Sequence, residues 1–422
     1  MKSFGKKSPW SALKKALATT AAAAGVALGG AAQADDTIKI GFGMALTGGL
    51  AGAGKGALIA MEVWRDDVNA RGGILGKQVE LVYYDDQSNP ATVPGIYTKL
   101  LDIDEVDFVV SGYGTNLIAP AMPIMMQRGL VFPALFGLAV NEKFNYDNYF
   151  QIMPAGPEPM TDWSRGFFEI AMAQDPAPKS IALVSADAEF ARNAATGARQ
   201  TADKLGLEIV YDESYHPKTA DFSPIVNAIQ ARKPDIVFVA SYPPDSVGMV
   251  KAVNEVGLKT RLFGGGMVGL QFASIMTALG PQLNGIVNYD FWVPEPTLKF
   301  EGVEEFLVKY QKAAEGKGVD PIGYYLQPYA YAYLQVLDQA IAATGSMDHA
   351  EIGKYMRDAE FDTVVGKVRF APNGEWAKTR VLQVQYQGIE DNELATFTKQ
   401  GTRVVLYPAE WVSGELNYPY AQ

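Results

Sequence analysis

Residues 47–57 read TGGLAGAGKGA and differ from a phosphate-binding loop at one position. From Gly49 the spacing is G-x-x-x-x-G-K-G, whereas a P-loop ends in Ser or Thr. That hydroxyl binds Mg²⁺ in P-loop enzymes, and Gly56 has no side chain to replace it. We therefore predict that this stretch binds no nucleotide. We interpret it as a tight turn into a helix whose first N–H groups stay free for an anionic group such as a carboxylate.

Other residue types that could catalyse a reaction are sparse. The chain has no Cys and two His, His216 and His349, which lack metal-ligand spacing and are expected at the surface. No G-x-S-x-G nucleophile motif is present. The acid pairs at 66–67 and 85–86 fit a solvated helix face and a strand end better than a catalytic site. We therefore predict no catalytic residue, no bound metal and no cofactor, and hence a protein that is not an enzyme.

Residues 1–34 contain the three parts of a secretory signal peptide. Five Lys and no acid lie in residues 1–15, an Ala-rich apolar run follows, and Ala32-Gln33-Ala34 is an A-x-A cleavage site. A membrane anchor is the alternative, but the apolar run is short and rich in Ala and Gly. We predict an exported, soluble protein that is cleaved after Ala34. The net charge of −11 disfavours nucleic acid as a partner, and the lack of Cys leaves stability to core packing.

After the signal peptide, the hydrophobic pattern alternates between the periods of strands and of helices. This alternation predicts parallel β-α-β units, interrupted once near 149–159, and hence two successive α/β sets. An antiparallel ribbon is expected around Asn373-Gly374. The expected strands are 38–44, 79–86, 107–113, 130–136, 180–187, 208–215, 235–242, 261–266 and 285–292. The expected helices are 55–70, 91–102, 117–127, 191–205, 222–232, 245–256, 270–279, 298–314, 322–343 and 348–358.

The order of these segments resembles the periplasmic solute-binding proteins of ABC transporters, specifically the leucine/isoleucine/valine-binding type. Residues 38–86 follow the family opening: a strand, a TG loop, a helix, the pattern N-A-x-G-G-I-x-G and a strand that ends in DD. Segments 111–137, 235–266 and 328–346 continue the resemblance, which covers about 37–390. It implies a type I periplasmic binding protein fold, in which two Rossmann-like α/β lobes with parallel sheets are joined by a three-strand hinge.

The resemblance also implies a division of the chain and a function. The implied parts are the signal peptide 1–34, lobe 1 from 35–153 plus 289–365, and lobe 2 from 154–288 plus 366–422. A monomeric periplasmic protein of this kind closes on a small carboxylate ligand in the cleft between the lobes and delivers it to the membrane permease of an ABC importer. The alternative is a periplasmic ligand-sensing protein of the same fold that reports to a regulator or receptor.

The ends of the strands that face the cleft are the implied binding positions. Thr115 falls on the position whose hydroxyl binds the ligand carboxylate, whereas Leu138 stands where the family often has a hydroxyl. The implied ligand-binding residues are Thr47, Gly48, Thr115, Asn116, Phe136, Gly137 and Leu138 in lobe 1, and Phe190, Tyr242, Gly266 and Met267 in lobe 2. Simpler alternatives stay open: core packing for the two Phe, a helix cap for Thr115 and loop packing for Tyr242.

The largest departure from the family lies in LFGGGMVGL, residues 262–270, which contain no acid. Amino-acid binders place a Glu at about Gly266 to pair with the ligand ammonium group. A buried ammonium without its carboxylate costs several kcal/mol. We therefore favour a carboxylate without an ammonium group, namely an aromatic or alkyl acid. In the alternative, Asp187, Glu189 or Asp245 supplies the negative charge from a neighbouring loop.

Overall fold

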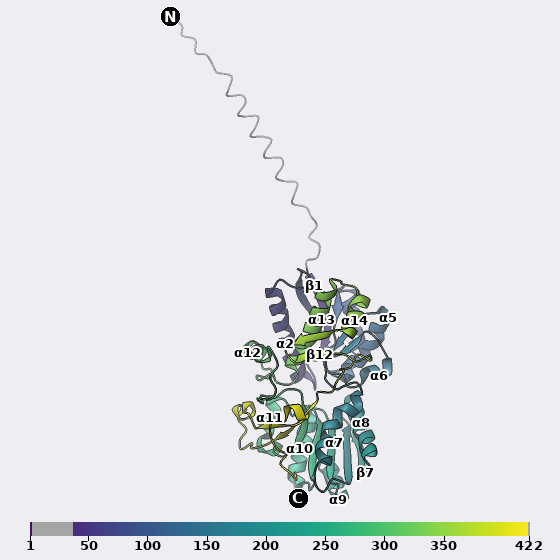
Figure 1. Cartoon of the computed structure of the whole chain (residues 1–422), viewed down its shortest axis with the longest axis vertical. Helices are drawn as coiled ribbons and strands as arrows, with labels where there is room; N and C mark the ends of the chain where they lie inside the picture. The colour runs from purple at the N-terminus through teal and green to yellow at the C-terminus, as the bar shows by residue number, and fades with distance from the viewer. Residues whose placement is uncertain (2–36, 421–422) are drawn as a thin grey trace. The chain divides into compact units, whose positions relative to one another are not determined.

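The computed structural model describes Met1 and residues 37–420 (Figure 1). The expected signal peptide and its cleavage after Ala34 fall outside the described residues, Met1 apart. Among the described residues, no helix combines the length and the apolar character needed to cross a membrane. Residues 38–422 belong to one contact unit of the chain, which holds both α/β sets.

The first α/β set, here called lobe 1, is built on short parallel strands. In β1 (Thr37–Met44) the alternate residues Ile38, Ile40, Phe42 and Met44 are fully buried, as a strand with one face on the core requires. The sheet order is β2-β1-β3, and β4 pairs in parallel with β5. The other strands are β2 (Gln78–Asp85), β3 (Phe108–Val109), β4 (Phe132–Ala134) and β5 (Tyr149–Gln151).

Helices from both halves of the sequence complete lobe 1. The late helix α13 packs on α2, so that purple and green segments lie together in Figure 1. A short hairpin of β11 (Glu360–Thr363) and β12 (Gly366–Arg369) comes after these helices in the sequence. The helices are α2 (Ala51–Ala70), α3 (Val93–Asp102), α4 (Thr115–Ile118), η2 (Ala119–Ala121), α5 (Met122–Arg128), α6 (Val140–Phe144), α12 (Val303–Ala314), α13 (Gln327–Thr344) and α14 (His349–Asp358).

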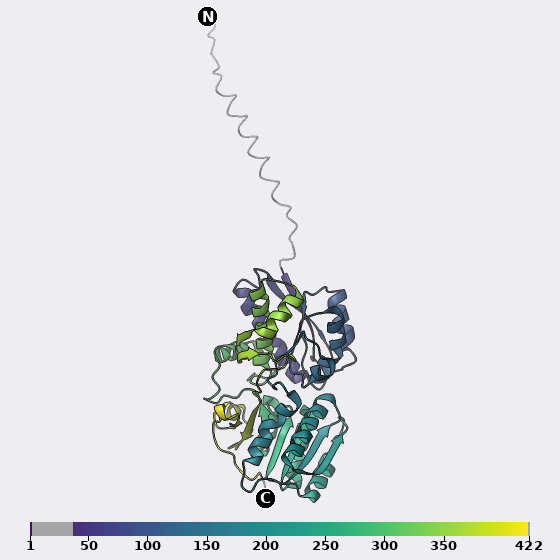
Figure 2. The same cartoon turned by 45° about the vertical axis from the view of Figure 1, so that its right-hand side comes forward.

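The second set, lobe 2, is built on a seven-stranded sheet of order β14-β13-β10-β9-β8-β6-β7 (Figure 2). Every residue of the inner strand β8 is buried, because β8 lies in the parallel part of the sheet, where helices cover both faces. The strands are β6 (Ser180–Ala186), β7 (Glu208–Tyr215), β8 (Ile236–Ser241), β9 (Leu262–Met267), β10 (Val287–Asp290), β13 (Leu382–Tyr386) and β14 (Arg403–Tyr407). The helices are α7 (Pro159–Met172), α8 (Glu189–Leu205), α9 (Ser223–Arg232), α10 (Pro243–Val256), α11 (Ala273–Leu279), η3 (Gly280–Leu283), η4 (Leu394–Thr398) and η5 (Ala409–Trp411).

The chain passes between the two sets three times, through 152–158, 291–302 and 370–381. The expected ribbon around Asn373-Gly374 is confirmed only next to the turn, where Phe370 and Trp376 form an antiparallel bridge. The longer flanking strands belong to different sheets. β12 pairs with β11, and β13 pairs with β10 in lobe 2. The exact lobe bounds stay a prediction, and the expected bound between 365 and 366 falls inside the β11–β12 hairpin.

The glycine-rich stretch is helical rather than a loop. Helix α2 begins at Ala51, four residues before the expected start at 55, so that three of the glycines lie in its first turns. A Cβ on Gly54 would lie 2.0 Å from the carbonyl oxygen of Ala45, and one on Gly56 would lie 2.4 Å from Nε2 of Gln327. These glycines therefore let α2 approach the end of β1 and the helix α13 closely.

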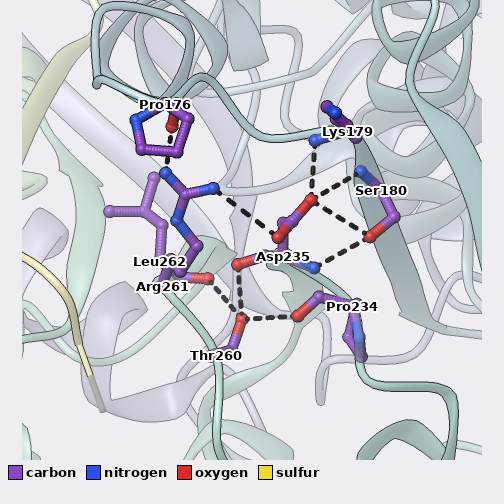
Figure 3. Close-up of polar contacts among 8 residues, drawn as sticks. All are labelled: Pro176, Lys179, Ser180, Pro234, Asp235, Thr260, Arg261 and Leu262. Atoms are coloured by element: carbon purple, nitrogen blue, oxygen red, sulfur yellow. Dashed lines mark hydrogen bonds and ion pairs between the residues drawn. The ribbon is translucent and has the colours of Figure 1, made fainter. Parts of the chain in front are cut away.

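Asp235, just before β8, connects the starts of three neighbouring lobe 2 strands (Figure 3). These starts lie opposite the strand ends that are described in the next subsection. Its Oδ2 accepts the backbone N–H of Lys179 at 2.7 Å and that of Ser180 at 3.1 Å. Arg261, just before β9, lies 3.6 Å from the same carboxylate. In lobe 1, Asp107 has the same place before β3 and accepts the N–H of Lys39 at 2.8 Å. Both lobes thus use an Asp to fix neighbouring parallel strands.

Candidate ligand-binding cavity

A buried cavity lies where strand ends and connecting segments of both lobes meet. It offers a volume of about 30 Å³ to the centres of water-sized molecules. Seven of its thirteen lining residues are aromatic, and none is charged. The lining residues are Leu50, Tyr113, Gly114, Thr115, Asn116, Phe136, Met153, Trp163, Phe190, Tyr242, Val268, Tyr289 and Tyr325.

Lobe 1 supplies the loop after β3, which carries Thr115 and Asn116 at the start of α4. Thr115 is buried, and its Oγ1 accepts the N–H of Leu138 at 2.9 Å. A hydroxyl that accepts one hydrogen bond still has its own hydrogen to donate. Thr115 can therefore donate to an anionic group in the cavity.

Phe136, just after β4, is held in the wall by a backbone that is unusual for its residue type. Its φ is +61°, a conformation that costs a bulky residue about 1–3 kcal/mol and that persists where the surroundings enforce it. The N–H of Phe136 donates to Oε1 of Gln151 at 3.0 Å, which fixes this conformation. Its ring lies 5.6 Å from that of Tyr325 and 4.6 Å from that of Phe291. The strain favours a binding role over plain core packing.

Lobe 2 supplies a row of rings from the starts of three helices. Trp163 in α7 lies 5.6 Å from Phe190 in α8, and Phe190 lies 5.9 Å from Tyr242 before α10, measured between ring centroids. Trp163 is 1% exposed, and its Nε1 is buried without a hydrogen-bond partner. An unpaired buried N–H is costly, so this indole favours an acceptor in its neighbourhood.

The two lobes also contact each other directly through hydrogen bonds at the rim of the cavity. Oδ1 of Asn116 accepts the hydroxyl of Tyr242 at 3.0 Å and the N–H of Phe190 at 3.3 Å. Nδ2 of Asn193 donates to the carbonyl of Leu138 at 2.9 Å. The structure therefore shows the lobes in a closed arrangement that protein groups themselves support.

Tyrosine hydroxyls supply most of the remaining polar wall. The hydroxyls of Tyr289 and Tyr325 lie 2.9 Å apart. Burial raises the pKa of Tyr113 to about 12, against the effect of a hydrogen bond with Tyr325. The wall is thus made of neutral donors and acceptors, which suits binding of a polar molecule rather than proton transfer near neutral pH.

Five of the eleven sequence-predicted site residues line the cavity: Thr115, Asn116, Phe136, Phe190 and Tyr242. Thr47, Gly48, Gly137, Leu138, Gly266 and Met267 lie outside the lining.

The lobe 1 residues outside the lining have structural partners. The hydroxyl of Thr47 donates to Asp85 at 2.7 Å. Gly48 has a φ of +85°, and a Cβ at this position would collide with the carbonyl oxygen of Gln87. Leu138 donates its N–H to Thr115. The carbonyl of Gly137 accepts Nε2 of Gln151 at 2.8 Å. The loops are those that the sequence indicates, and neighbouring residues of each loop form the wall.

In lobe 2, β9 continues one residue beyond its expected end at 266. Gly266 and Met267 are therefore sheet residues, and the N–H of Met267 donates to Asn288 at 2.9 Å. Val268, the next residue, reaches the wall.

Sequence reasoning missed eight lining residues. Val268 directly follows β9, and Tyr113 and Gly114 lie in the loop after β3, so the strand-end rule could have found them. Trp163 lies close to the first crossing, and Tyr289 lies close to the second. For the rest, the sequence holds no clear signal. The missed residues are Leu50, Tyr113, Gly114, Met153, Trp163, Val268, Tyr289 and Tyr325.

The three acids considered as partners for an ammonium group are absent from the lining. Asp187 pairs with Arg192 at 2.8 Å. Oδ2 of Asp245 accepts the hydroxyl of Tyr215 at 3.3 Å, and burial raises the pKa of Asp245 to about 6. Among the residues that the structure describes, no group of three or more His, Asp or Glu is arranged to hold a metal ion. His349, expected at the surface, is half-buried and accepts the N–H of Val131 at 3.1 Å.

Known proteins share this architecture. The family described as periplasmic binding protein matches residues 37–391. The Leu/Ile/Val-binding protein homolog 2 of Brucella abortus (strain 2308) is 25% identical over 378 residues, which cover 89% of this chain and 96% of that protein.

Two solved structures show the same fold at low identity. The branched-chain amino acid transporter substrate-binding protein LivJ of Streptococcus pneumoniae, in complex with isoleucine, has a TM-score of 0.72 at 20% identity, over 88% of this chain and 100% of that chain. An ABC transporter solute-binding protein of R. palustris, in complex with 4-hydroxybenzoate, has a TM-score of 0.72 at 20% identity, over 87% and 95%. The resemblance seen in the sequence is confirmed: the chain belongs to the periplasmic binding protein family and has the type I fold of its Leu/Ile/Val-binding members.

Proposed function

We propose that this chain is the exported substrate-binding component of an ABC importer, which closes on a small carboxylate and delivers it to a membrane permease. The observation that supports this most is the cavity that both lobes enclose, because ligand closure between two lobes is the motion of binding proteins of this architecture. The family is one of solute-binding proteins rather than enzymes. We propose further that the protein acts as a monomer in the periplasm.

We propose that the ligand carries a carboxylate but no ammonium group. The hydroxyl of Thr115 and the indole N–H of Trp163 are donors, which suit an anion. An ammonium group would need acceptors, and a buried one would need a negative partner. The uncharged lining offers it no carboxylate.

The remainder of the ligand is proposed to be an aromatic ring or an alkyl chain. Rings at 4.4–5.9 Å from one another, Tyr289–Trp163, Trp163–Phe190 and Phe190–Tyr242, form a continuous apolar surface. Aromatic pairs prefer such offset or edge-to-face contacts. The fold by itself does not choose the ligand, since the two similar structures hold isoleucine and 4-hydroxybenzoate. The composition of the wall favours the acid.

A thermal-shift screen tests this function. The mature protein is unfolded and refolded to remove carried-over ligand, and then mixed with leucine, valine, phenylalanine, benzoate, hydroxycinnamate or short fatty acids. A ligand at 100 times its Kd stabilises by about 2.7 kcal/mol and raises the Tm measurably. We expect shifts from the acids and none from leucine. A shift from leucine alone would contradict the proposed ligand class.

Two further measurements test the carboxylate site and the transport role. Thr115→Ala should weaken binding of the acid about tenfold, because a hydrogen bond to a charged group is worth about 1.5–3 kcal/mol. Thr115→Ser keeps the hydroxyl and is the matched control. Deletion of the gene should abolish uptake of the labelled acid by the cells. Unchanged uptake would favour the sensing alternative.

A further inference from the structure

Three tyrosine hydroxyls from separate segments meet in the wall of the cavity. Tyr113 follows β3, Tyr289 lies in β10, and Tyr325 precedes α13. The side chains of the three are 4%, 1% and 4% exposed. Oη of Tyr289 lies 2.9 Å from Oη of Tyr325, and Tyr113 lines the same cavity. We call these three residues the tyrosine cluster.

A count of hydrogens shows that the tyrosine cluster has capacity left for a ligand. Each hydroxyl has one hydrogen to donate and two lone pairs to accept. The hydrogen bond between Tyr289 and Tyr325 uses one of the three hydrogens, so that two O–H groups and several lone pairs remain. Burial keeps the hydroxyls neutral, since the pKa values of Tyr289 and Tyr325 lie well above the ordinary value. The cluster can therefore donate and accept at the same time.

On the lobe 2 side of the cavity, aromatic rings lie between Tyr289 of the tyrosine cluster and Asn116. From Asn116 the wall runs through Tyr242 to Phe190, then to Trp163 at 5.6 Å, and then to Tyr289 at 4.4 Å. All of these residues face the same cavity. On this side of the cavity, an apolar surface thus lies between the hydroxyl of Tyr289 and Asn116.

We propose that the tyrosine cluster binds a hydroxyl group of the ligand, so that the ligand class is hydroxy-substituted aromatic carboxylic acids. This inference rests on the proposed function, since the carboxylate occupies the Thr115 end. A ligand hydroxyl both donates and accepts, as the cluster does. A second carboxylate would only accept hydrogen bonds and would leave the lone pairs of the cluster without a donor.

The test measures Kd by calorimetry for pairs of acids that differ in one hydroxyl. The pairs are benzoate with 3- and 4-hydroxybenzoate, and cinnamate with 4-hydroxycinnamate; 4-methylbenzoate controls for size. The variants Tyr325→Phe and Tyr289→Phe each remove one hydroxyl and keep the ring. Tyr331→Phe is the matched control, because the hydroxyl of Tyr331 donates to Asp67 at 2.8 Å away from the cavity lining.

We expect at least one hydroxylated acid to bind wild type about tenfold more tightly than its parent acid. Tyr325→Phe and Tyr289→Phe should reduce this preference at least fivefold, whatever they do to the Kd of the parent acid, whereas Tyr331→Phe should change neither the preference nor the Kd. Equal affinity of wild type for parent and hydroxylated acids would overturn the inference and leave the proposed function standing. An equal loss of affinity for the parent and the hydroxylated acid in Tyr325→Phe and Tyr289→Phe would also overturn the inference and leave the proposed function standing. If leucine binds and no acid does, both proposals fail.

Discussion

The two lobes contribute different chemistry to one cavity. Lobe 1 supplies Thr115 and Asn116 on the loop after β3, where a hydroxyl and an amide lie together. Lobe 2 supplies Trp163, Phe190 and Tyr242, whose rings lie against one another and whose one hydroxyl is donated to Asn116. We infer that lobe 1 holds the charged group of the ligand and that lobe 2 covers its apolar part during closure. Variants matched between the lobes can break or sharpen this comparison.

The largest expected effect concerns two buried tryptophans, one in each lobe. Trp163 and Trp64 in α2 are both almost fully buried, and each has an unpaired Nε1. Replacement by Ala should reduce the free energy of unfolding by about 3–5 kcal/mol in each case, because a large cavity remains. Trp163→Ala should also abolish acid binding, whereas Trp64→Ala should bind like wild type. Chemical denaturation and calorimetry measure the two quantities.

Equal binding by the two alanine variants would contradict the covering role of lobe 2. If either alanine variant does not fold, the milder pair Trp163→Phe and Trp64→Phe makes the same comparison. The phenylalanine at 163 loses the indole N–H but keeps a ring, so it also separates hydrogen bonding from apolar contact.

Each lobe also holds a buried acid that makes stability depend on pH. Burial raises the pKa of Asp86 in lobe 1 and of Asp245 in lobe 2 from 3.8 to about 6. The stabilisation that comes from keeping these carboxyl groups neutral is therefore fully present below about pH 4, and it is lost as the pH rises through about 6. Asp86→Asn and Asp245→Asn mimic the neutral form and should match wild type at pH 4. At pH 8 the free energy of unfolding of each variant should be about 1–3 kcal/mol higher than that of wild type.

Urea unfolding at pH 4, 6 and 8 measures this difference. A variant curve parallel to that of wild type over the whole range would contradict the assignment for that residue. If one variant changes the pH dependence and the other does not, the pH sensitivity of the fold belongs to one lobe.

Much of the fold could be predicted because local patterns and long-range packing agree. The alternate buried residues of β1 and the continuous apolar run of β8 are strong strand signals. The start of α2 was missed because the glycines at 52, 54 and 56 read as a loop. Their helical state depends on close contacts with Ala45 and Gln327, and the latter lies far away in sequence.

The candidate site was predictable to the extent that it follows strand ends. The positions of Thr115, Phe136 and Tyr242 were inferred in this way. Tyr325 was not, because it enters the cavity from the segment before α13, and its partner Tyr289 is 36 residues away in sequence. Gly266 and Met267 were displaced by an error of one residue at the end of β9. Such errors at element ends are the usual limit of pattern reading.

Substitution of the Asp residues at the strand starts should have a smaller effect on the free energy of unfolding and no effect on binding. Asp235 accepts two N–H groups and pairs with Arg261, whereas Asp107 accepts the N–H of Lys39. Asp235→Ala should therefore lower the free energy of unfolding by about 2 kcal/mol and Asp107→Ala by about 1 kcal/mol. Neither should change the Kd of the acid, since both lie at the strand ends opposite the cavity. A changed Kd would show that strand position at this edge is coupled to the site.

The smallest expected effect concerns the hydrogen bonds between the lobes. Asn116 accepts two donors from lobe 2, and Asn193 donates one hydrogen bond to lobe 1. In an open arrangement these groups bond to water instead, so their loss penalises closure alone. At about 0.5–1.5 kcal/mol per hydrogen bond, Asn116→Ala should weaken acid binding about tenfold and Asn193→Ala about threefold.

The open–closed equilibrium separates this effect on closure from a lost ligand contact. Without ligand, small-angle scattering should give Asn116→Ala a larger radius of gyration than wild type, with Asn193→Ala between the two. Saturating acid should then bring all three to the same value. If Asn116→Ala binds more weakly but scatters like wild type without ligand, Asn116 contacts the ligand directly. Lobe 1 would then hold the carboxylate with Asn116 as well as Thr115, and the closed state would depend on the ligand rather than on bonds between the lobes.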